Sequence, residues 1–222
     1  MSGLQDENAA PNINVQLGSP YIAKSLKNLN DSAGEPLPTE EVTALCRCGN
    51  SNNKPYCDGT HLQIGFVGEK EADRVPDRVD EYEGVVITIV DNRGVCSHAG
   101  ICTDNLPRVF RLGTEPWIDP TGATVEEIIA LVEQCPSGAL SYRMNGVRHQ
   151  DHDGGPAVKV TRNGPYYVTG GVELTDDQGS EPEAENHYAL CRCGNSKNKP
   201  FCNGAHWDGF EDDGTWKGSG SE

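Results

Sequence analysis

Short segments that read as strands appear at two places in the chain, at a constant offset of 145 positions. NINVQ at residues 12–16 aligns with AVKVT at residues 157–161, and PYIAK at residues 20–24 aligns with PYYVT at residues 165–169. Short runs rich in Val, Ile and Tyr between polar and Gly/Pro positions indicate strands. We therefore expect two related units, each with a few short strands.

The stretch between these units contains one apolar run and one helical pattern. GVVITIV at residues 84–90 predicts a strand. Further on, Thr124 and Glu127 form a capping box. The apolar residues that follow share one helical face, namely Val125, Ile128, Ile129 and Val132. We predict a helix that starts after Thr124 and ends at Cys135-Pro136.

Each strand pair leads into a nearly identical string, CRCGNSNNKPYCDGTH at residues 46–61 and CRCGNSKNKPFCNGAH at residues 191–206, with twelve of sixteen positions unchanged. The repeat defines a duplicated domain of roughly fifty to sixty residues. Such a unit is too small to bury much core alone. A bound metal or pairing between the copies must therefore stabilise it.

Composition agrees with small domains and many loops. Apolar residues make up 35% of the 222 positions, and there are 26 glycines and 14 prolines. We expect three domains, at residues 1–70, 71–150 and 151–222. The predicted fold class is α+β, with two small β-rich units that pair within the chain around a ferredoxin-like α+β middle domain.

Charge and cysteine count limit the possible settings and partners. The net charge of −16 argues against binding to nucleic acid or to anionic membranes. It fits solubility, a salty cytoplasm or a redox partner with a basic face. Nine cysteines are an odd number for a disulfide scaffold, the start MSGLQDENAA lacks a signal peptide, and no apolar run could span a membrane. We expect a soluble cytoplasmic protein.

Each repeated string offers three thiols and one imidazole as ligands. The two sets are Cys46, Cys48, Cys57 and His61, and Cys191, Cys193, Cys202 and His206. A structural zinc ion accepts such a set, but its ligands usually come from C-x2-4-C turns rather than C-x-C. A two-iron cluster spans farther and takes two ligands per iron. From spacing alone, both remain open.

Both strings resemble the CDGSH iron–sulfur motif, and the first matches it at every fixed position, including Ser51, Pro55, Asp58 and Gly59. The resemblance implies a [2Fe-2S] cluster in each copy. Cys46 and Cys48 would bind one iron, Cys57 and His61 the other, with the second copy mapping the same way. It further implies a strand cap shared by two clusters. Since both copies lie in one chain here, we expect a monomer.

Two features of these loops bear on the cluster environment. We expect Asp58 to cap the short helix that carries His61, and Asn203 to keep that cap without the charge. The two outer clusters can then differ in potential. Lys54 and Lys199 lie within the ligand loops, either as solvated charges or as cations that favour the reduced cluster.

The middle stretch carries the remaining three cysteines. Cys96 and Cys102 followed by a remote Cys135-Pro136 are typical of a ferredoxin, in which a distant Cys-Pro closes the cluster site. The usual central loop ligand would fall at Ala99, which cannot ligate. Three thiolates suit a [3Fe-4S] cluster, or a [4Fe-4S] cluster whose fourth iron takes His98 or an outside ligand.

This stretch also resembles the divergent single-cluster ferredoxin-like domain. The matching motifs are Cys96-x-His98-x3-Cys102, Pro116-Trp117 and the CPSGAL ending at residues 135–140. The resemblance implies a [4Fe-4S] cluster and makes His98 the leading fourth ligand. The alternative is that His98 only packs beside three ligating cysteines.

The other histidines and the tryptophans receive no functional role. His149, His152 and His187 are interpreted as ordinary surface or loop residues, and Trp117, Trp207 and Trp216 as packing residues. The chain has no dinucleotide loop, P-loop or Ser/His/Asp arrangement. We therefore expect a carrier of single electrons rather than an enzyme. The alternative is iron–sulfur cluster storage, transfer, or redox or pH sensing.

Overall fold

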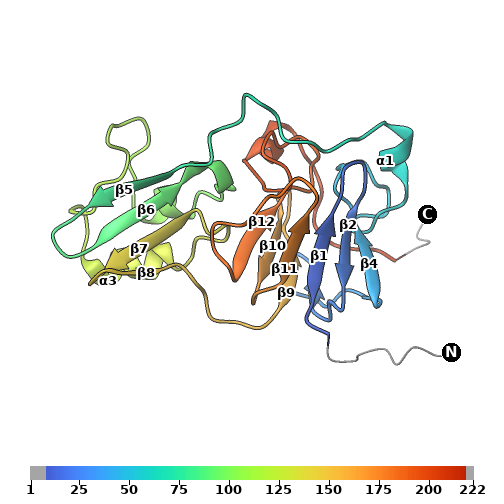
Figure 1. Cartoon of the computed structure of the whole chain (residues 1–222), viewed down its shortest axis with the longest axis horizontal. Coiled ribbons are helices and arrows are strands. Elements are labelled where there is room, and N and C mark those ends of the chain that lie inside the picture. Colours follow the sequence, from blue (N-terminus) through green and yellow to red (C-terminus); the bar gives the residue numbers. More distant parts are fainter. Residues whose placement is uncertain (1–8, 219–222) are drawn as a thin grey trace.

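The computed structural model of the chain describes residues 9–218. Most of the start on which the missing signal peptide was predicted, residues 1–8, lies outside the described residues. The described chain has more strand than helix, and its strands form three four-stranded sheets (Figure 1). The strands of the C-terminal repeat lie between the middle domain and the strands of the N-terminal repeat (Figure 1).

The two repeats have the same elements in the same order. The N-terminal repeat contains β1 (Asn12–Val15), β2 (Tyr21–Lys24), β3 (Leu29–Asn30), β4 (Val42–Leu45) and the helix α1 (Thr60–Gln63). The C-terminal repeat contains β9 (Ala157–Val160), β10 (Tyr166–Thr169), β11 (Glu173–Asp176), β12 (His187–Leu190) and the 3-10 helix η2 (Ala205–Asp208). The four strands expected from the sequence are present as β1, β2, β9 and β10.

The repeats exchange their third strands. One sheet has the order β11-β1-β2-β4, and the other has the order β12-β10-β9-β3. Strand β11 pairs parallel to β1, with Leu174 opposite Ile13, and β3 pairs parallel to β9, with Leu29 opposite Val158. Each outer sheet is therefore completed by a strand from the other repeat.

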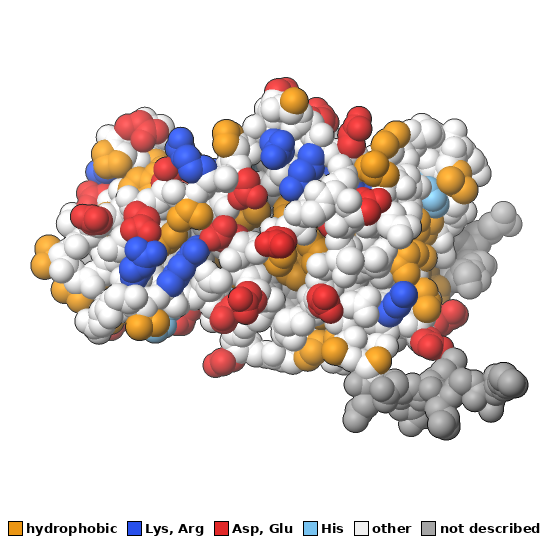
Figure 2. All heavy atoms as spheres, viewed as in Figure 1, with side chains coloured by type: hydrophobic (Ala, Val, Ile, Leu, Met, Phe, Trp, Pro, Cys, Tyr) orange, Lys and Arg blue, Asp and Glu red, His pale blue; other side chains and the backbone are white. Residues whose placement is uncertain are grey.

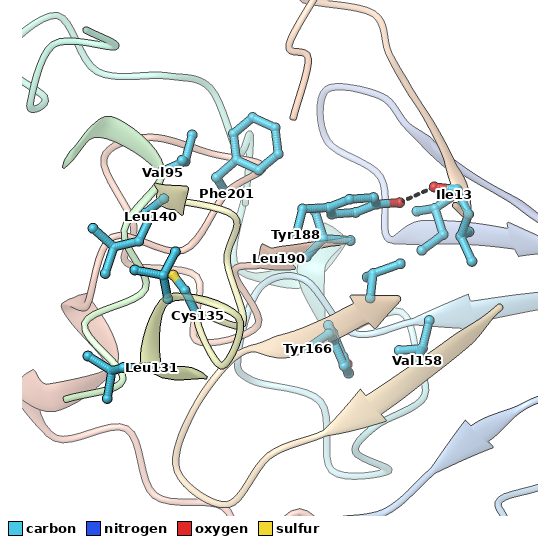
Figure 3. Close-up of a cluster of buried hydrophobic side chains, with 14 of the residues drawn as sticks. Ile13, Val95, Leu131, Cys135, Leu140, Val158, Tyr166, Tyr188, Leu190 and Phe201 are labelled. Atoms are coloured by element: carbon cyan, nitrogen blue, oxygen red, sulfur yellow. Dashed lines mark hydrogen bonds between the residues drawn. The ribbon is translucent and has the colours of Figure 1, made fainter. Parts of the chain in front are cut away.

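One hydrophobic core joins the two outer sheets. Alternate residues of β1 and β9 are buried, among them Ile13 and Val158. Figure 3 shows these two side chains with Tyr166, Tyr188 and Leu190 in one cluster. The Tyr188 hydroxyl donates a 2.8 Å hydrogen bond to the carbonyl of Val172. The alternation that predicts the strands thus also selects the side chains that fill this core.

The middle domain is an antiparallel sheet in chain order. It contains β5 (Val79–Glu83), β6 (Thr88–Asn92), β7 (Leu140–Met144) and β8 (Val147–His149). The strand predicted at residues 84–90 was placed too early. Val85 is 97% exposed and Val86 is also exposed, because the β5–β6 hairpin turns here, closed by the Gly84 amide bonding to the Ile87 carbonyl at 2.9 Å.

The predicted helix is present as α3 (Val125–Val132), and its capping box between Thr124 and Glu127 is confirmed. The helix ends three residues before Cys135, whose amide bonds to the Val132 carbonyl at 3.0 Å in a final turn. A short helix that the sequence did not reveal, α2 (Ile101–Asn105), holds Cys102. Among residues 9–218, no helix combines the length and apolar character needed to cross a membrane.

Candidate metal centres

The N-terminal ligand loop leaves β4 and folds back onto it. The Cys46 amide donates to the Pro55 carbonyl at 2.7 Å, and the Cys57 amide to the Ala44 carbonyl at 2.9 Å. Cys46 Sγ then lies 4.0 Å from Cys48 Sγ, while Cys57 Sγ lies 3.2 Å from His61 Nδ1. The four predicted ligands therefore form two close pairs.

The C-terminal loop repeats this geometry. The Cys191 amide bonds to the Pro200 carbonyl at 2.8 Å, as the equivalent amide does in the first loop. Cys191 Sγ is 3.7 Å from Cys193 Sγ, and Cys202 Sγ is 3.3 Å from His206 Nδ1. All four of these side chains are buried. The duplicated sequence thus yields the same paired arrangement of donors in both loops.

A serine and a lysine hold each loop in shape. The Ser51 hydroxyl donates to the Tyr56 carbonyl at 2.7 Å and accepts from the Asn53 amide at 3.0 Å. Lys54 Nζ donates to the Ser51 carbonyl at 2.6 Å, and Lys199 is buried with its ammonium on the Ser196 carbonyl. Lys199 is therefore not a solvated charge, because its side chain is buried and its ammonium donates to a backbone carbonyl inside the loop.

The expected cap at Asp58 needs a correction. Helix α1 begins after Gly59, which has a left-handed backbone and is itself the N-cap. Asp58 still accepts from the Thr60 amide at 3.0 Å, as Asn203 does from the Ala205 amide at 3.2 Å. Burial would raise the pKa of Asp58, but hydrogen bonds from Thr60 and from the Asn52 amide lower it to about 2.

Each repeat supplies a tyrosine to the ligand loop of the other. The Tyr21 hydroxyl bonds to the carbonyls of Cys191 at 2.8 Å and Pro200 at 3.0 Å. The Tyr166 hydroxyl bonds in the same way to Cys46 and Pro55, at 3.0 Å each. Because a phenol can donate only one proton, each hydroxyl is shared between two carbonyls. The two ligand loops are therefore positioned by one another's repeat.

The ligand loops also touch directly. A Cβ atom on Gly49 would lie 2.2 Å from the Cys193 carbonyl oxygen, and one on Gly194 would lie 2.3 Å from the Cys48 carbonyl oxygen. Both glycines have positive φ angles, 77° and 81°. Only glycine combines this backbone with so close an approach. The invariant Cys-Gly pair of the repeat thus brings the two sites together.

A buried arginine stands between the first two cysteines of each site. Arg47 donates to the carbonyls of Gln16 at 2.9 Å and Gly68 at 2.7 Å. Arg192 donates to the Gly164 carbonyl at 2.8 Å and forms an ion pair with Asp212, also at 2.8 Å. Each arginine therefore ties its ligand loop to neighbouring backbone, and Arg192 is also paired with a carboxylate.

The three middle cysteines line one cavity of about 210 Å³. Cys96 follows the 3-10 helix η1 (Arg93–Val95), Cys102 lies in the first turn of α2, and Cys135 follows α3. His98 and Ala99 line the same cavity. The structure thus brings together all the residues that the sequence assigned to this site. Burial raises the pKa of the Cys96 thiol to about 12, and coordination to a metal ion would instead favour the thiolate.

Sequence reasoning missed a buried ion pair in this cavity. Asp91 is buried on β6, and its carboxylate lies 3.3 Å from Nε of Arg93. The Arg93 guanidinium is 3.5 Å from the ring centre of Trp117 and 3.8 Å from Cys96 Sγ. Burial raises the pKa of Asp91 to about 6, although Arg93 opposes the shift. The available signal in the sequence was that two charged residues, Asp91 and Arg93, stand just before Cys96, a predicted ligand.

One of the three remaining histidines differs from its expected role. His187 is fully buried on β12, and its ring stacks on His152 at 3.6 Å between centres, so His187 is not a surface or loop residue. His149 is exposed on β8, where it stacks on Tyr142, and is a surface residue as expected. Burial and the neighbouring His152 lower the pKa of His187 to about 4.

Two of the three tryptophans have the packing role expected of them, and the third does not. Trp117 packs against Phe110 and Tyr82, and Trp216 packs against Tyr56, as expected of packing residues. Trp207 was wrongly assigned to packing, because its side chain is 70% exposed. Its indole N–H nevertheless donates to the His98 carbonyl at 3.2 Å. Trp207 therefore joins the C-terminal ligand turn to the middle domain.

Comparison with known protein families agrees with these three sites. The family described as an iron-binding zinc finger of CDGSH type matches residues 18–62 and 163–207, and the divergent 4Fe-4S mono-cluster family matches residues 82–145. Over 62 residues the chain is 37% identical to "Uncharacterized protein YjdI" of Escherichia coli K12 and of strain O157:H7, covering 28% of this chain and 82% of each relative. No solved structure matches the chain.

The chain belongs to the CDGSH-type iron-binding family, with a divergent 4Fe-4S mono-cluster domain between its two CDGSH domains. Both resemblances expected from the sequence are thereby confirmed. The ligand assignments, the domain boundaries and the ferredoxin-like fold of the middle domain stay predictions.

The donor geometry fits iron–sulfur clusters. At each outer site two thiols form one pair and a thiol with an imidazole forms the other. Within residues 9–218, no three His, Cys, Asp or Glu side chains gather as they would around a single metal ion. Two separate pairs suit a cluster whose two irons each take two ligands. The middle cavity is lined by three thiols, enough for a [3Fe-4S] cluster, and by His98 as a further donor.

Proposed function

We propose that this chain is a multi-cluster iron–sulfur protein that carries single electrons between redox partners. The observation that carries the proposal is the grouping of all nine cysteines into three separate sites, each assembled by its own segment and each inside a matched iron-binding domain. Such clusters, when bound, supply one-electron reduction and oxidation without bond-making by the protein. No catalytic group needs to be assigned.

The chain's own residues would bind and shield the clusters. In each outer site the paired donors would hold a [2Fe-2S] cluster, and the buried side chains of Arg47 and Arg192 would fix the ligand loop to neighbouring backbone carbonyls. In the middle site Cys96, Cys102 and Cys135 would hold a cubane, with His98 on the cavity wall as the fourth ligand of a [4Fe-4S] form. Without a fourth ligand, a [3Fe-4S] form would result.

The proposed partners are redox proteins with a basic face rather than nucleic acids or membranes. The net charge of −16 supports this choice. Figure 2 shows Asp and Glu side chains spread over the face in view, with Lys and Arg side chains among them. We further propose that the chain acts as a monomer, because β11 and β3 already complete the two outer sheets from within one chain.

Iron and sulfide analysis with EPR on anaerobically purified protein tests the proposal. The expected result is eight irons if the middle site is [4Fe-4S] and seven if it is [3Fe-4S], with reducible [2Fe-2S] signals separate from a cubane signal. Zinc in the outer sites, or iron that cannot be reduced and reoxidised, would contradict electron transfer.

One observation favours a second function, the delivery of a cluster to another protein. Cys57 is partly exposed, whereas its counterpart Cys202 is buried. A histidine ligand such as His61 is also released more readily than a thiolate when it is protonated. Mixing the loaded chain with an apo-ferredoxin distinguishes the two functions. Rapid transfer at neutral pH supports delivery, and retention with fast redox cycling supports electron transfer.

A further inference from the structure

The two CDGSH sites have the same ligands but different surroundings. The last turn of the C-terminal site lies against the middle domain, where a Cβ atom on Gly204 would be 2.8 Å from Nδ1 of His98. The equivalent glycine of the N-terminal site, Gly59, has no atom within 4 Å of the same position. Both glycines have nearly the same φ angle, 85° and 87°. The difference therefore comes from the neighbour and not from the backbone.

Three further contacts join the middle domain to the C-terminal ligand loop. Cys202 Sγ lies 4.0 Å from the Ser97 carbonyl oxygen, and the Trp207 indole donates to the His98 carbonyl at 3.2 Å. The side-chain amide of Asn198 donates to the Gly94 carbonyl. The contacts thus reach the thiol of Cys202, the 3-10 helix η2 and the middle of the ligand loop. Residues 94–98 form a cover over the site, which we name the Ser97–His98 cover after the two residues nearest to the ligand turn.

The N-terminal site has no such cover among the described residues. Cys57 is partly exposed where Cys202 is 2% exposed. Leu62, which corresponds to Trp207, has no side-chain donor that could replace the hydrogen bond of Trp207 to the middle domain. Asn53, which corresponds to Asn198, bonds to Trp216 rather than to the middle domain. Figure 2 shows hydrophobic side chains at the surface near the α1 end of the molecule. From Cys57 to Thr60 the turn is thus more exposed than its copy, while His61 is buried as His206 is.

The cover is built into the middle site itself. Ser97 and His98 lie between two predicted cubane ligands, Cys96 and Cys102, and His98 also lines the middle cavity. The Ser97 amide bonds to the Ser137 hydroxyl at 3.4 Å, which ties the cover to the segment after Cys135. Because His98 has a positive φ of 55°, the loop turns sharply at the point of contact. The position of the cover therefore depends on the order of the middle site.

We propose that the middle domain closes the C-terminal CDGSH site through the Ser97–His98 cover, and that the N-terminal CDGSH site is the one that exchanges with solvent and partners. This inference rests on the proposed clusters but does not depend on whether the chain transfers electrons or clusters. It assigns the two copies different roles. The C-terminal site is internal, and the turn from Cys57 to His61 is where a partner reaches the chain.

A test on the cluster-free full-length chain uses thiol alkylation followed by mass spectrometry. The Cys57 peptide should react about tenfold or more faster than the Cys202 peptide, because the covered turn must open locally before it reacts. His98→Gly suits the positive φ at this position. It should raise the Cys202 rate several-fold and leave the Cys57 rate unchanged. Equal wild-type rates, or an unchanged Cys202 rate in the variant, would overturn the proposal.

Matched glycine variants test the same contact in the loaded chain. Gly204→Ala and Gly59→Ala impose the same backbone strain, but only the first creates a contact with His98. During incubation with an iron chelator, Gly204→Ala should accelerate loss of the C-terminal cluster, relative to the wild type, more than Gly59→Ala accelerates loss of the N-terminal one. His98→Gly removes the atoms that the new Cβ atom meets, so its effect on this loss in Gly204→Ala should differ from its effect in the wild type, whereas its effect in Gly59→Ala should equal that in the wild type. Additive effects in both pairs would show that the cover does not act on the site.

The experiment also separates this inference from the proposed function. Iron and sulfide counts on the wild type come first, and missing clusters would contradict the proposed function. If the clusters are present and both outer sites lose iron at the same rate, the proposed function stands and the cover is refuted. If Gly204→Ala does not fold, the alkylation rates of Cys57 and Cys202 in the wild type and in His98→Gly still test the cover.

Discussion

The outer pair of sites and the middle site are built in opposite ways. Each outer site depends on residues from the other repeat, including an exchanged strand and a tyrosine hydroxyl on its ligand loop. The middle site is assembled from a single stretch, residues 91–140, around one cavity. The difference indicates that the outer sites form or fail together, whereas the middle site can be lost alone.

The largest expected effect is the loss of a whole cluster. Cys135→Ser removes one of three thiols from the middle cavity and touches neither outer loop, so only the cubane EPR signal should disappear. The [2Fe-2S] signals should keep their intensity. If they disappear while the cubane persists, the division of cysteines among the sites is wrong.

Gly49→Ala should damage both outer sites at once. Its Cβ atom would meet the Cys193 carbonyl oxygen at 2.2 Å and would sit on a backbone with φ of 77°. Strain and overpacking together should lower the free energy of unfolding by about 3–5 kcal/mol. Gly34→Ala is the control, because Gly34 also has a positive φ but open space around it. It should cost about 1 kcal/mol in urea unfolding, and a similar loss in both variants would refute the contact.

The middle site should contribute its own pH dependence through Asp91. Burial raises the pKa of this carboxyl to about 6, so between its ordinary value and about 6 the folded chain binds more protons than the unfolded chain. Stability should therefore fall as the pH rises through this window. Arg93 and Asp80 are the charges that act on it.

Asp91→Asn should remove this fall and gain about 2–3 kcal/mol at pH 7, by the free-energy equivalent of a pKa shift of this size. Urea unfolding at several pH values measures it, with the exposed Glu126→Gln as control. If the free energy of unfolding changed with pH in the same way in the wild type and in Asp91→Asn, the raised pKa of Asp91 would be contradicted.

The smallest effect tests the crossed tyrosines. Tyr166→Phe removes a hydroxyl from the carbonyls of Cys46 and Pro55, so a change in the C-terminal repeat should weaken the N-terminal site. The expected loss is about 1–2 kcal/mol for a buried acceptor left without its donor. Tyr21→Phe should weaken the C-terminal site in the same way. Removing the iron with a chelator and then measuring the alkylation rate of each cysteine would show which ligand loop is loosened. If Tyr166→Phe loosened the C-terminal loop instead of the N-terminal one, the crossed dependence of the two sites would be refuted.

Local features of the fold were predictable from the sequence. The capping box at Thr124 and Glu127 needs only neighbouring residues, and the alternation in residues 12–16 and 157–161 identifies buried faces. The ligand strings are recognisable because they occur twice. In each case the residues that determine the feature are close together in the chain, so the sequence alone is enough to predict it.

Features set by distant partners were not predictable. Strand β3 has only two residues, Leu29 and Asn30, and their sequence does not indicate that they pair with β9. His187 reads as a loop residue beside Asn186, yet it is buried because His152 stacks on its ring. The contact of His98 with Gly204 joins segments whose spacing carries no signal. These choices depend on which surfaces meet after the sheets form.

The exchanged strands have a consequence for the order in which the protein can be completed during synthesis. Ile13 leaves the ribosome long before Leu174, its partner across the β1–β11 pair, has been translated. The middle sheet needs no strand from outside residues 79–149, so it can be finished while the first repeat still lacks an edge and the hydroxyl of Tyr166. Long-range pairing of this kind is slow. The first ligand loop to be made is therefore among the last to be fixed, and iron offered early in translation would find the middle site ready before either outer one.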